Sequence, residues 1–194
     1  MKLKTSITIL GGCLAIFIFI MLPIVLSIQE KKVANVASYT GSSFILTDVN
    51  NNPITEKSFQ SPATALFFGF THCPDVCPLT LTKLKIISEQ LKKDQNKLKI
   101  FFISIDPERD TPELVKDYLE SFGKQFIGIT GESEKIFKLA SSWGILKEKI
   151  FTEDGEYTLN HSSPVILLKD GKYVDTIKQQ DDIKKSLKKI KKLL

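Results

Sequence analysis

Residues 65–78 decide the fold of this chain, and they read Ala65-Leu66-Phe67-Phe68-Gly69-Phe70-Thr71-His72-Cys73-Pro74-Asp75-Val76-Cys77-Pro78. The first six form a short, nearly continuous apolar run, which is typical of a central strand covered on both faces. After this stretch, residues 79–93 carry leucine and isoleucine at helical spacing. The two cysteines therefore lie where a buried strand meets a helix, which is the crevice edge of an open α/β sheet.

Strands and helices alternate along the rest of the chain. The apolar patterns predict a hairpin at 44–47 and 54–55, a strand at 99–105, a helix that starts at Asp110 or Thr111, a strand at 126–130, a helix at 133–143, a hairpin at 165–168 and 172–177, and a closing helix from Asp182. This order is typical of a three-layer α/β architecture. We predict a thioredoxin-like domain with an N-terminal hairpin.

The closing helix is amphipathic. One face carries Ile183, Leu187, Ile190 and Leu194, and lysines surround the rest. Such a stripe can lie on an anionic membrane surface, but a closing helix that packs on a sheet needs the same stripe. We predict packing on the sheet.

The first segment predicts a membrane anchor. Residues 5–28 contain no charged side chain and are long enough to cross a bilayer as a helix. We therefore expect a transmembrane helix at 5–28, a polar linker at 29–42 and the globular domain at 43–194. Lys2 and Lys4 place residues 1–4 in the cytoplasm, because positive charge is retained on that side of the membrane.

The same segment has two other interpretations. Leu10-Gly11-Gly12-Cys13 looks like a lipoprotein cleavage box, but the apolar run continues beyond Cys13, where a mature lipoprotein would turn polar. The residues before the span contain no arginine and cannot form a mitochondrial presequence. We expect a single-pass protein of the bacterial inner membrane, with its C-terminal domain in the periplasm.

Lysine supplies almost all of the positive charge. Of the 27 basic residues only Arg109 is an arginine, which leaves 26 lysines, and the formal net charge is +5. The lysines are dispersed, without the clustered arginines and aromatic residues of a nucleic-acid groove, so we expect no nucleic-acid partner. The retained Arg109 suggests a need for a planar guanidinium. We predict that it makes a bidentate carboxylate contact that fixes its loop.

Cys73 and Cys77 are four residues apart at the predicted start of the helix. In a first helical turn, side chains at this spacing lie on one face, and the helix N-terminus favours thiolates. The pair is suited to a bound metal, a disulfide or a redox couple, and two unrelated cysteines are the weakest interpretation. The spacing differs slightly from the Cys-x₂-Cys of the usual redox helix, so a third residue is needed to choose.

The chain has two histidines, His72 and His161. His72 adjoins Cys73 but is expected to point away from the face of Cys77. His161 comes just before a strand expected to run antiparallel to its neighbours, so it should lie on the sheet edge that holds the cysteines. Two thiolates and an imidazole suit Cu(I) and can also hold Cu(II), whereas a structural zinc would need a fourth ligand.

The sequence resembles the Sco/SenC family of copper-binding assembly factors for cytochrome c oxidase. The resemblance extends from about Ser43 to Ile177. It rests on four motifs: Gly69-Phe70-Thr71-His72-Cys73-Pro74-Asp75-Val76-Cys77-Pro78, Asp106-Pro107-Glu108-Arg109-Asp110-Thr111-Pro112, Phe126-Ile127-Gly128-Ile129-Thr130-Gly131 and His161-Ser162. It implies a domain that is tethered by one N-terminal span.

This resemblance implies copper ligands at Cys73, Cys77 and His161, with one copper per domain. The implied function is delivery of copper to the dinuclear copper centre of oxidase subunit II, with periplasmic copper carriers or thiol reductants as further partners. The alternative is a membrane-anchored thiol-disulfide oxidoreductase that reduces the cysteines of that centre. Cys73 and Cys77 would be catalytic only in that case. One departure is Asn160, where an aspartate often precedes the ligand histidine, and it is expected to alter copper affinity but not the ligands.

Overall fold

The computed structural model describes Met21 and residues 43–194. The predicted cytoplasmic segment 1–4, the anchor 5–28 and the linker 29–42 lie outside the described residues, apart from Met21. Within the described part of the chain, no helix is both long enough and apolar enough to cross a membrane.

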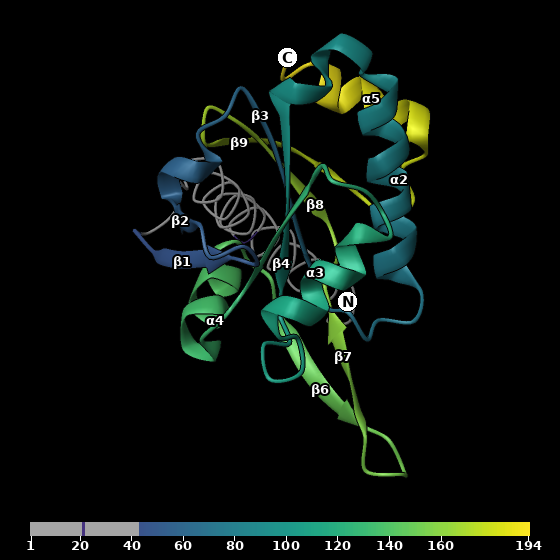
Figure 1. Cartoon of the computed structure of the whole chain (residues 1–194). Coiled ribbons are helices and arrows are strands. Elements are labelled where there is room, and N and C mark those ends of the chain that lie inside the picture. The colour runs from purple at the N-terminus through teal and green to yellow at the C-terminus, as the bar shows by residue number, and fades with distance from the viewer. Residues whose placement is uncertain (1–20, 22–42) are drawn as a thin grey trace, which may run out of the picture. The chain divides into compact units, whose positions relative to one another are not determined.

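A mixed sheet of seven strands forms the centre of the domain, in the order β2-β1-β5-β4-β3-β8-β9. Its strands are β1 (Ile45–Asp48), β2 (Pro53–Thr55), β3 (Ala63–Gly69), β4 (Leu98–Ser104), β5 (Phe126–Thr130), β8 (Val165–Lys169) and β9 (Lys172–Ile177). Strands β3, β4 and β5 are parallel, whereas β8 runs antiparallel to β3, as predicted. The start of β8 therefore lies at the sheet edge where β3 and β4 end (Figure 1).

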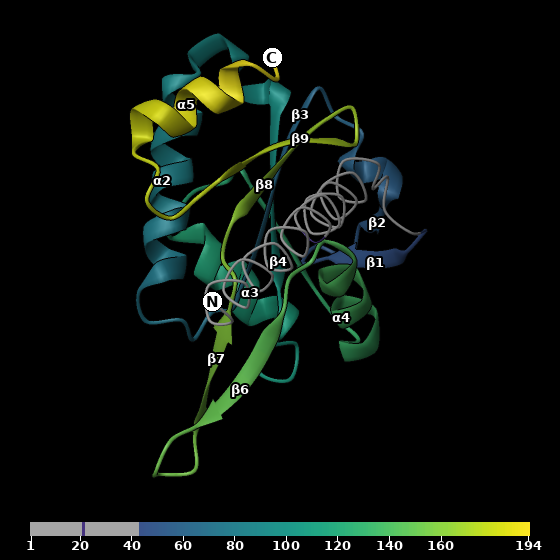
Figure 2. The ribbon, with the colours of Figure 1, turned by 180° about the vertical axis from the view of Figure 1, so that it is seen from behind.

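Helices cover the sheet on both faces. They are α2 (Val76–Gln90), α3 (Pro112–Glu120), α4 (Ser133–Ser142) and α5 (Ile183–Lys191), with 3-10 helices η1 (Glu56–Phe59) and η2 (Lys92–Lys97). The chain steps in the same direction across the sheet from β3 to β4 and from β4 to β5. Because connections between parallel strands are right-handed, α2 and α3 lie on the same face of the sheet (Figure 1). The chain returns past β3 to form β8, which places α4 on the opposite face (Figure 2).

The central strand is buried throughout. All seven residues of β3 are buried, and Phe67 and Phe68 are completely inaccessible. The apolar run that predicted this strand is therefore explained by helices packing on both sides of it. Trp143 is also a core residue, with 6% of its surface exposed.

Helix α2 begins earlier than its pattern predicted. It starts at Val76 and not at Leu79, and Pro78 lies in its first turn. Proline is tolerated there because the first N–H groups of a helix have no partner within the helix. The apolar spacing that defines the buried face appears only after this turn.

The apolar periodicity predicts no element in residues 147–161, yet they form a hairpin of β6 (Lys147–Phe151) and β7 (Tyr157–His161). It projects from the domain beside the ends of the central strands (Figure 1). Most of β6 is exposed or half-exposed, so it lacks a buried stripe. The signal that marks this hairpin is Asp154-Gly155, a typical hairpin-turn dipeptide, and Gly155 has φ +85°.

The closing helix packs on the domain, as predicted. Ile190 is completely buried and Leu193 is 1% exposed, and α5 lies beside α2 (Figure 1). The Asp182 carboxylate caps the helix by accepting a hydrogen bond from Lys185 N at 2.6 Å. The apolar stripe of α5 is therefore used by the core.

Replacing Ile190 by alanine should lower the free energy of unfolding by about 2–4 kcal/mol, because it removes buried methyl groups and leaves a cavity. Urea unfolding followed by circular dichroism measures this change. Lys188→Ala, on the exposed side of α5, is the control and should change stability by less than about 0.5 kcal/mol. Equal effects of the two substitutions would show that α5 does not depend on this packing.

Candidate metal centre

The two cysteines flank the beginning of α2. Cys77 is the second residue of the helix and Asp75 is its N-cap, so Cys73 lies in the preceding turn. The prediction that both cysteines share a helical turn is therefore wrong. The turn is closed by Cys73 N, which donates to Phe70 O at 3.3 Å.

The Cys77 thiol is packed into the end of the central strand. Cys77 is completely buried, and a Cβ atom added at Gly69 would lie only 2.9 Å from its sulfur. The same added atom would lie 2.9 Å from the Phe102 ring. Glycine at position 69 thus makes room for the thiol, a role that the apolar run did not reveal.

The thiols are unequal in exposure and acidity, and both are free. A hydrogen bond from the Cys77 side chain lowers the pKa of Cys73 to about 5, with help from the backbone N–H groups of Cys77 and Asp75, against the opposing effect of burial. Hydrogen bonding to Cys73, together with burial, raises the pKa of Cys77 well above its ordinary range. At neutral pH the site therefore holds one thiolate and one thiol that stabilises it.

His161 ends β7 and lies beside the cysteine turn. Its ring packs edge-to-face on Phe70, the residue to which the turn is hydrogen-bonded, with ring centroids 5.7 Å apart. Burial lowers the pKa of His161, which favours a neutral imidazole. Nδ1 lies 3.0 Å from Ser162 O. A carbonyl oxygen can only accept a hydrogen bond, so this contact favours a proton on Nδ1 and leaves Nε2 available as a ligand.

The structure places the three predicted ligands in one neighbourhood without bringing them into a closed cluster. The charges of Cys73 and His161 influence each other's pKa. Among residues 43–194, however, no three Cys, His, Asp or Glu side chains are gathered closely enough to hold a metal ion. The complete ligand set of Cys73, Cys77 and His161 therefore stays a prediction.

His72 has different neighbours, in line with its predicted direction. Its Nδ1 lies 3.0 Å from Thr71 Oγ1 and 3.7 Å from Asp110 Oδ1, and 49% of its side chain is exposed. These contacts direct the ring toward the turn after β4, and neither is with a cysteine.

Arg109 makes the predicted carboxylate contact and a second contact that was not predicted. Its Nε and Nη2 lie 2.7 Å and 2.6 Å from one oxygen of Asp106. Its Nη1 donates to Tyr157 O at 2.8 Å, and its guanidinium lies 3.7 Å from the centre of the Tyr157 ring. Tyr157 in turn donates its hydroxyl to the other Asp106 oxygen at 2.7 Å. Arg109 thereby fastens the hairpin that carries His161.

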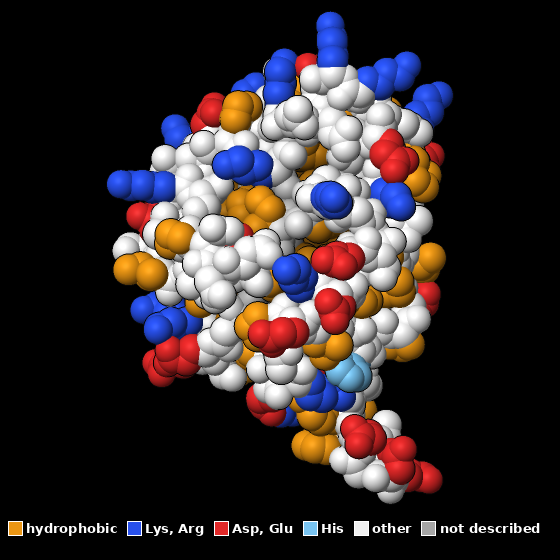
Figure 3. All heavy atoms as spheres, in the orientation of Figure 1, with side chains coloured by type: hydrophobic (Ala, Val, Ile, Leu, Met, Phe, Trp, Pro, Cys, Tyr) orange, Lys and Arg blue, Asp and Glu red, His pale blue; other side chains and the backbone are white. Residues whose placement is uncertain are grey.

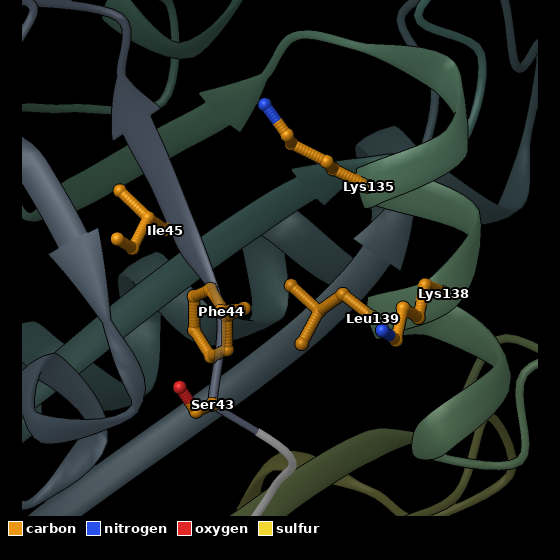
Figure 4. Close-up of a pocket in the computed structure, with 6 residues that line it drawn as sticks. All are labelled: Ser43, Phe44, Ile45, Lys135, Lys138 and Leu139. Atoms are coloured by element: carbon orange, nitrogen blue, oxygen red, sulfur yellow. The ribbon is translucent and has the colours of Figure 1, made fainter.

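The chemistry of these donors fits copper. Two sulfur ligands and a neutral imidazole form a soft donor set, which suits Cu(I) and tolerates Cu(II). A groove of about 500 Å³ between β1 and α4 does not offer this chemistry (Figure 4). It is lined by Ser43, Phe44, Ile45, Lys135, Lys138 and Leu139.

Comparisons with known proteins identify relatives of this chain. A family model described as SCO1/SenC matches residues 32–194. The chain is 36% identical to an SCO2-like protein of Rickettsia typhi over 137 residues, which are 69% of this chain and 68% of that protein. It is 35% identical to the mitochondrial protein SCO2 of Saccharomyces cerevisiae over 155 residues, which are 78% of this chain but only about half (52%) of the yeast protein.

A solved structure shows the same fold. The copper-bound structure of ScoI from Bradyrhizobium japonicum is 37% identical and matches with a TM-score of 0.73. The match covers 79% of this chain and 99% of that one. The thioredoxin-like α/β fold predicted for the domain is thus confirmed.

Alkylation of the metal-free, reduced protein should reveal the difference between the thiols. The rate at Cys73 should follow pH with a midpoint near 5, because a lowered pKa keeps the thiolate until the solution is acidified through that value. Iodoacetamide labelling read by mass spectrometry measures this midpoint. Cys77→Ala should move it toward the ordinary thiol value of about 8.5. A wild-type midpoint already near 8.5 would contradict the proposed hydrogen bond.

Proposed function

Because this chain belongs to the SCO1/SenC family, we propose that it is a copper-binding metallochaperone that assists assembly of the dinuclear copper centre of cytochrome c oxidase. One observation carries the proposal: two free thiols meet at the end of the central strand, with the imidazole of His161 beside them. The copper-bound relative from Bradyrhizobium japonicum supports copper as the cargo.

The two thiols would act in sequence on the arriving ion. Cys73 is partly exposed and already a thiolate at neutral pH, so it can make the first contact without losing a proton. Cys77 is buried and protonated, and must release its proton to become the second ligand. His161, neutral and with Nε2 available, would complete a three-coordinate site. Uptake at neutral pH would thus release about one proton, and acid would favour release of copper.

The expected setting of the domain follows from the first segment of the chain. An anchor at 5–28 would hold the domain on the periplasmic side of the bacterial inner membrane. There it could exchange copper with subunit II of the oxidase and with other copper carriers. Each of these partners is part of the proposal.

A thiol-disulfide oxidoreductase is the second candidate, and the unequal thiols favour it. The Cys73 thiolate would attack a disulfide of the partner and form a mixed disulfide, which releases one partner thiolate. Cys77 would then attack Cys73 after losing its proton, releasing the second partner thiolate. The chain is oxidised to a disulfide and the partner gains two electrons. This route needs no imidazole ligand.

His161→Ala distinguishes the two functions. Wild-type protein should bind one Cu(I) in an anaerobic titration against a competing chelator, and His161→Ala should weaken binding by about two orders of magnitude through loss of a ligand. His72→Ala is the matched control and should bind as the wild type does. Unchanged affinity in His161→Ala would remove His161 from the site.

The same variants can be tested in cells. As a metallochaperone, a chain with His161→Ala should leave the oxidase depleted of copper, and so should either cysteine variant. As a reductase, only the cysteine variants should do so. Copper content of the purified oxidase is the measurement, and a fully loaded oxidase in His161→Ala cells would favour the reductase.

A further inference from the structure

Asp110 is a buried carboxylate in the turn after β4. It is 1% exposed and accepts three hydrogen bonds from side chains or backbone outside its own turn. Thr71 N donates to Oδ2 at 3.0 Å, Thr71 Oγ1 donates to Oδ1 at 2.6 Å, and Ser104 Oγ donates to Oδ2 at 2.5 Å. Hydrogen bonds to a carboxylate are among the stronger ones in proteins.

Helix capping does not account for this carboxylate. The N-cap of α3 is Thr111, whose hydroxyl accepts from Leu114 N at 3.2 Å. Asp110 therefore points away from the helix that follows it and toward a segment 39 residues earlier in the chain. That segment is the cysteine turn, because Thr71 lies two residues before Cys73.

The turn that contains Asp110 also holds the other half of the site. Asp106 O accepts hydrogen bonds from Arg109 N at 3.1 Å and Asp110 N at 2.9 Å, so the turn is closed on itself. Asp106 and Arg109 fasten Tyr157, which lies four residues before His161 on β7. In this turn, Asp110 bonds the segment that carries the cysteines, and the adjacent Arg109 bonds the segment that carries His161.

We propose that Asp110 is a positioning residue of the metal centre, which holds the Thr71 end of the cysteine turn at a fixed distance from His161. This inference rests on the proposed function, since it assigns Asp110 a role in how the copper ligands are arranged. Asp110 does not contact the ligands. It acts through Thr71, while Arg109 fixes the hairpin on the other side.

Hydrogen exchange of the metal-free, full-length chain in detergent tests the first half of the proposal. Asp110→Ala should speed amide exchange in residues 71–77 by about tenfold, because loss of the carboxylate leaves Thr71 N without its acceptor. Asp48→Ala is the matched control. Asp48 is also buried and also accepts three hydrogen bonds, from Asn50 N, Asn52 N and Asn52 Nδ2, but it ends β1 and holds the β1–β2 turn. It should leave exchange in residues 71–77 unchanged.

Two smaller substitutions at Thr71 test the same hydrogen bond without removing the buried carboxylate. Thr71→Val is nearly isosteric and removes only the hydroxyl that donates to Asp110 Oδ1, so exchange in residues 71–77 should still rise several-fold. Thr71→Ser keeps the hydroxyl and should restore slow exchange. If Asp110→Ala does not fold, the difference between Thr71→Val and Thr71→Ser decides.

Copper binding by the same variants tests the second half. Asp110→Ala should weaken Cu(I) binding by about tenfold and shift the sulfur-to-copper charge-transfer band of the Cu(II) form, whereas Asp48→Ala should do neither. Wild-type exchange rates in both Asp110→Ala and Thr71→Val would overturn the proposal, as would equal losses in Asp48→Ala. A wild-type chain that binds no copper would instead refute the proposed function, and the exchange rates would still decide whether Asp110 holds the turn.

Discussion

The sulfur of Cys77 packs against the main chain of Gly69, and the metal centre depends on this contact. It sets one thiol into the hydrophobic core at the end of β3, where it is completely buried. The other thiol, on Cys73, is left in a turn before α2 and reaches the surface. The unequal acidity of the pair follows, since the buried thiol keeps its proton and donates a hydrogen bond to the partly exposed Cys73 thiolate.

Those parts of the fold that bury a continuous apolar stripe can be predicted from the sequence. The apolar run of residues 65–70 predicted the central strand, and the antiparallel direction expected for β8 predicted the sheet edge at which His161 lies. Arg109 predicted an ion pair because it is the single arginine in a chain whose other basic residues are lysines, and Asp106 is its partner. Each of these signals can be read from the sequence without knowing which distant segments meet.

What could not be predicted depends on contacts between distant segments. Asp110 looks like a helix cap in the sequence, but the carboxylate turns toward Thr71, and only the parallel pairing of β3 and β4 brings these two residues together. The β6–β7 hairpin buries too little apolar surface to show a pattern, although it carries His161. The helix start was misplaced because Pro78 occupies a first turn in which its missing N–H has no cost.

The strands of the β6–β7 hairpin are fastened to the domain at both ends of their ladder, whereas the acidic loop between them bonds within itself. Lys147 donates to Ile105 O, and Tyr157 is held by Asp106 and Arg109. Beyond the last strand pair, Phe151 and Tyr157, exposed Glu153, Asp154 and Glu156 form the acidic tip seen in Figure 3, and Thr152 bonds within the tip. The tip can therefore lengthen, shorten or change charge over generations while the imidazole at the base stays where it is.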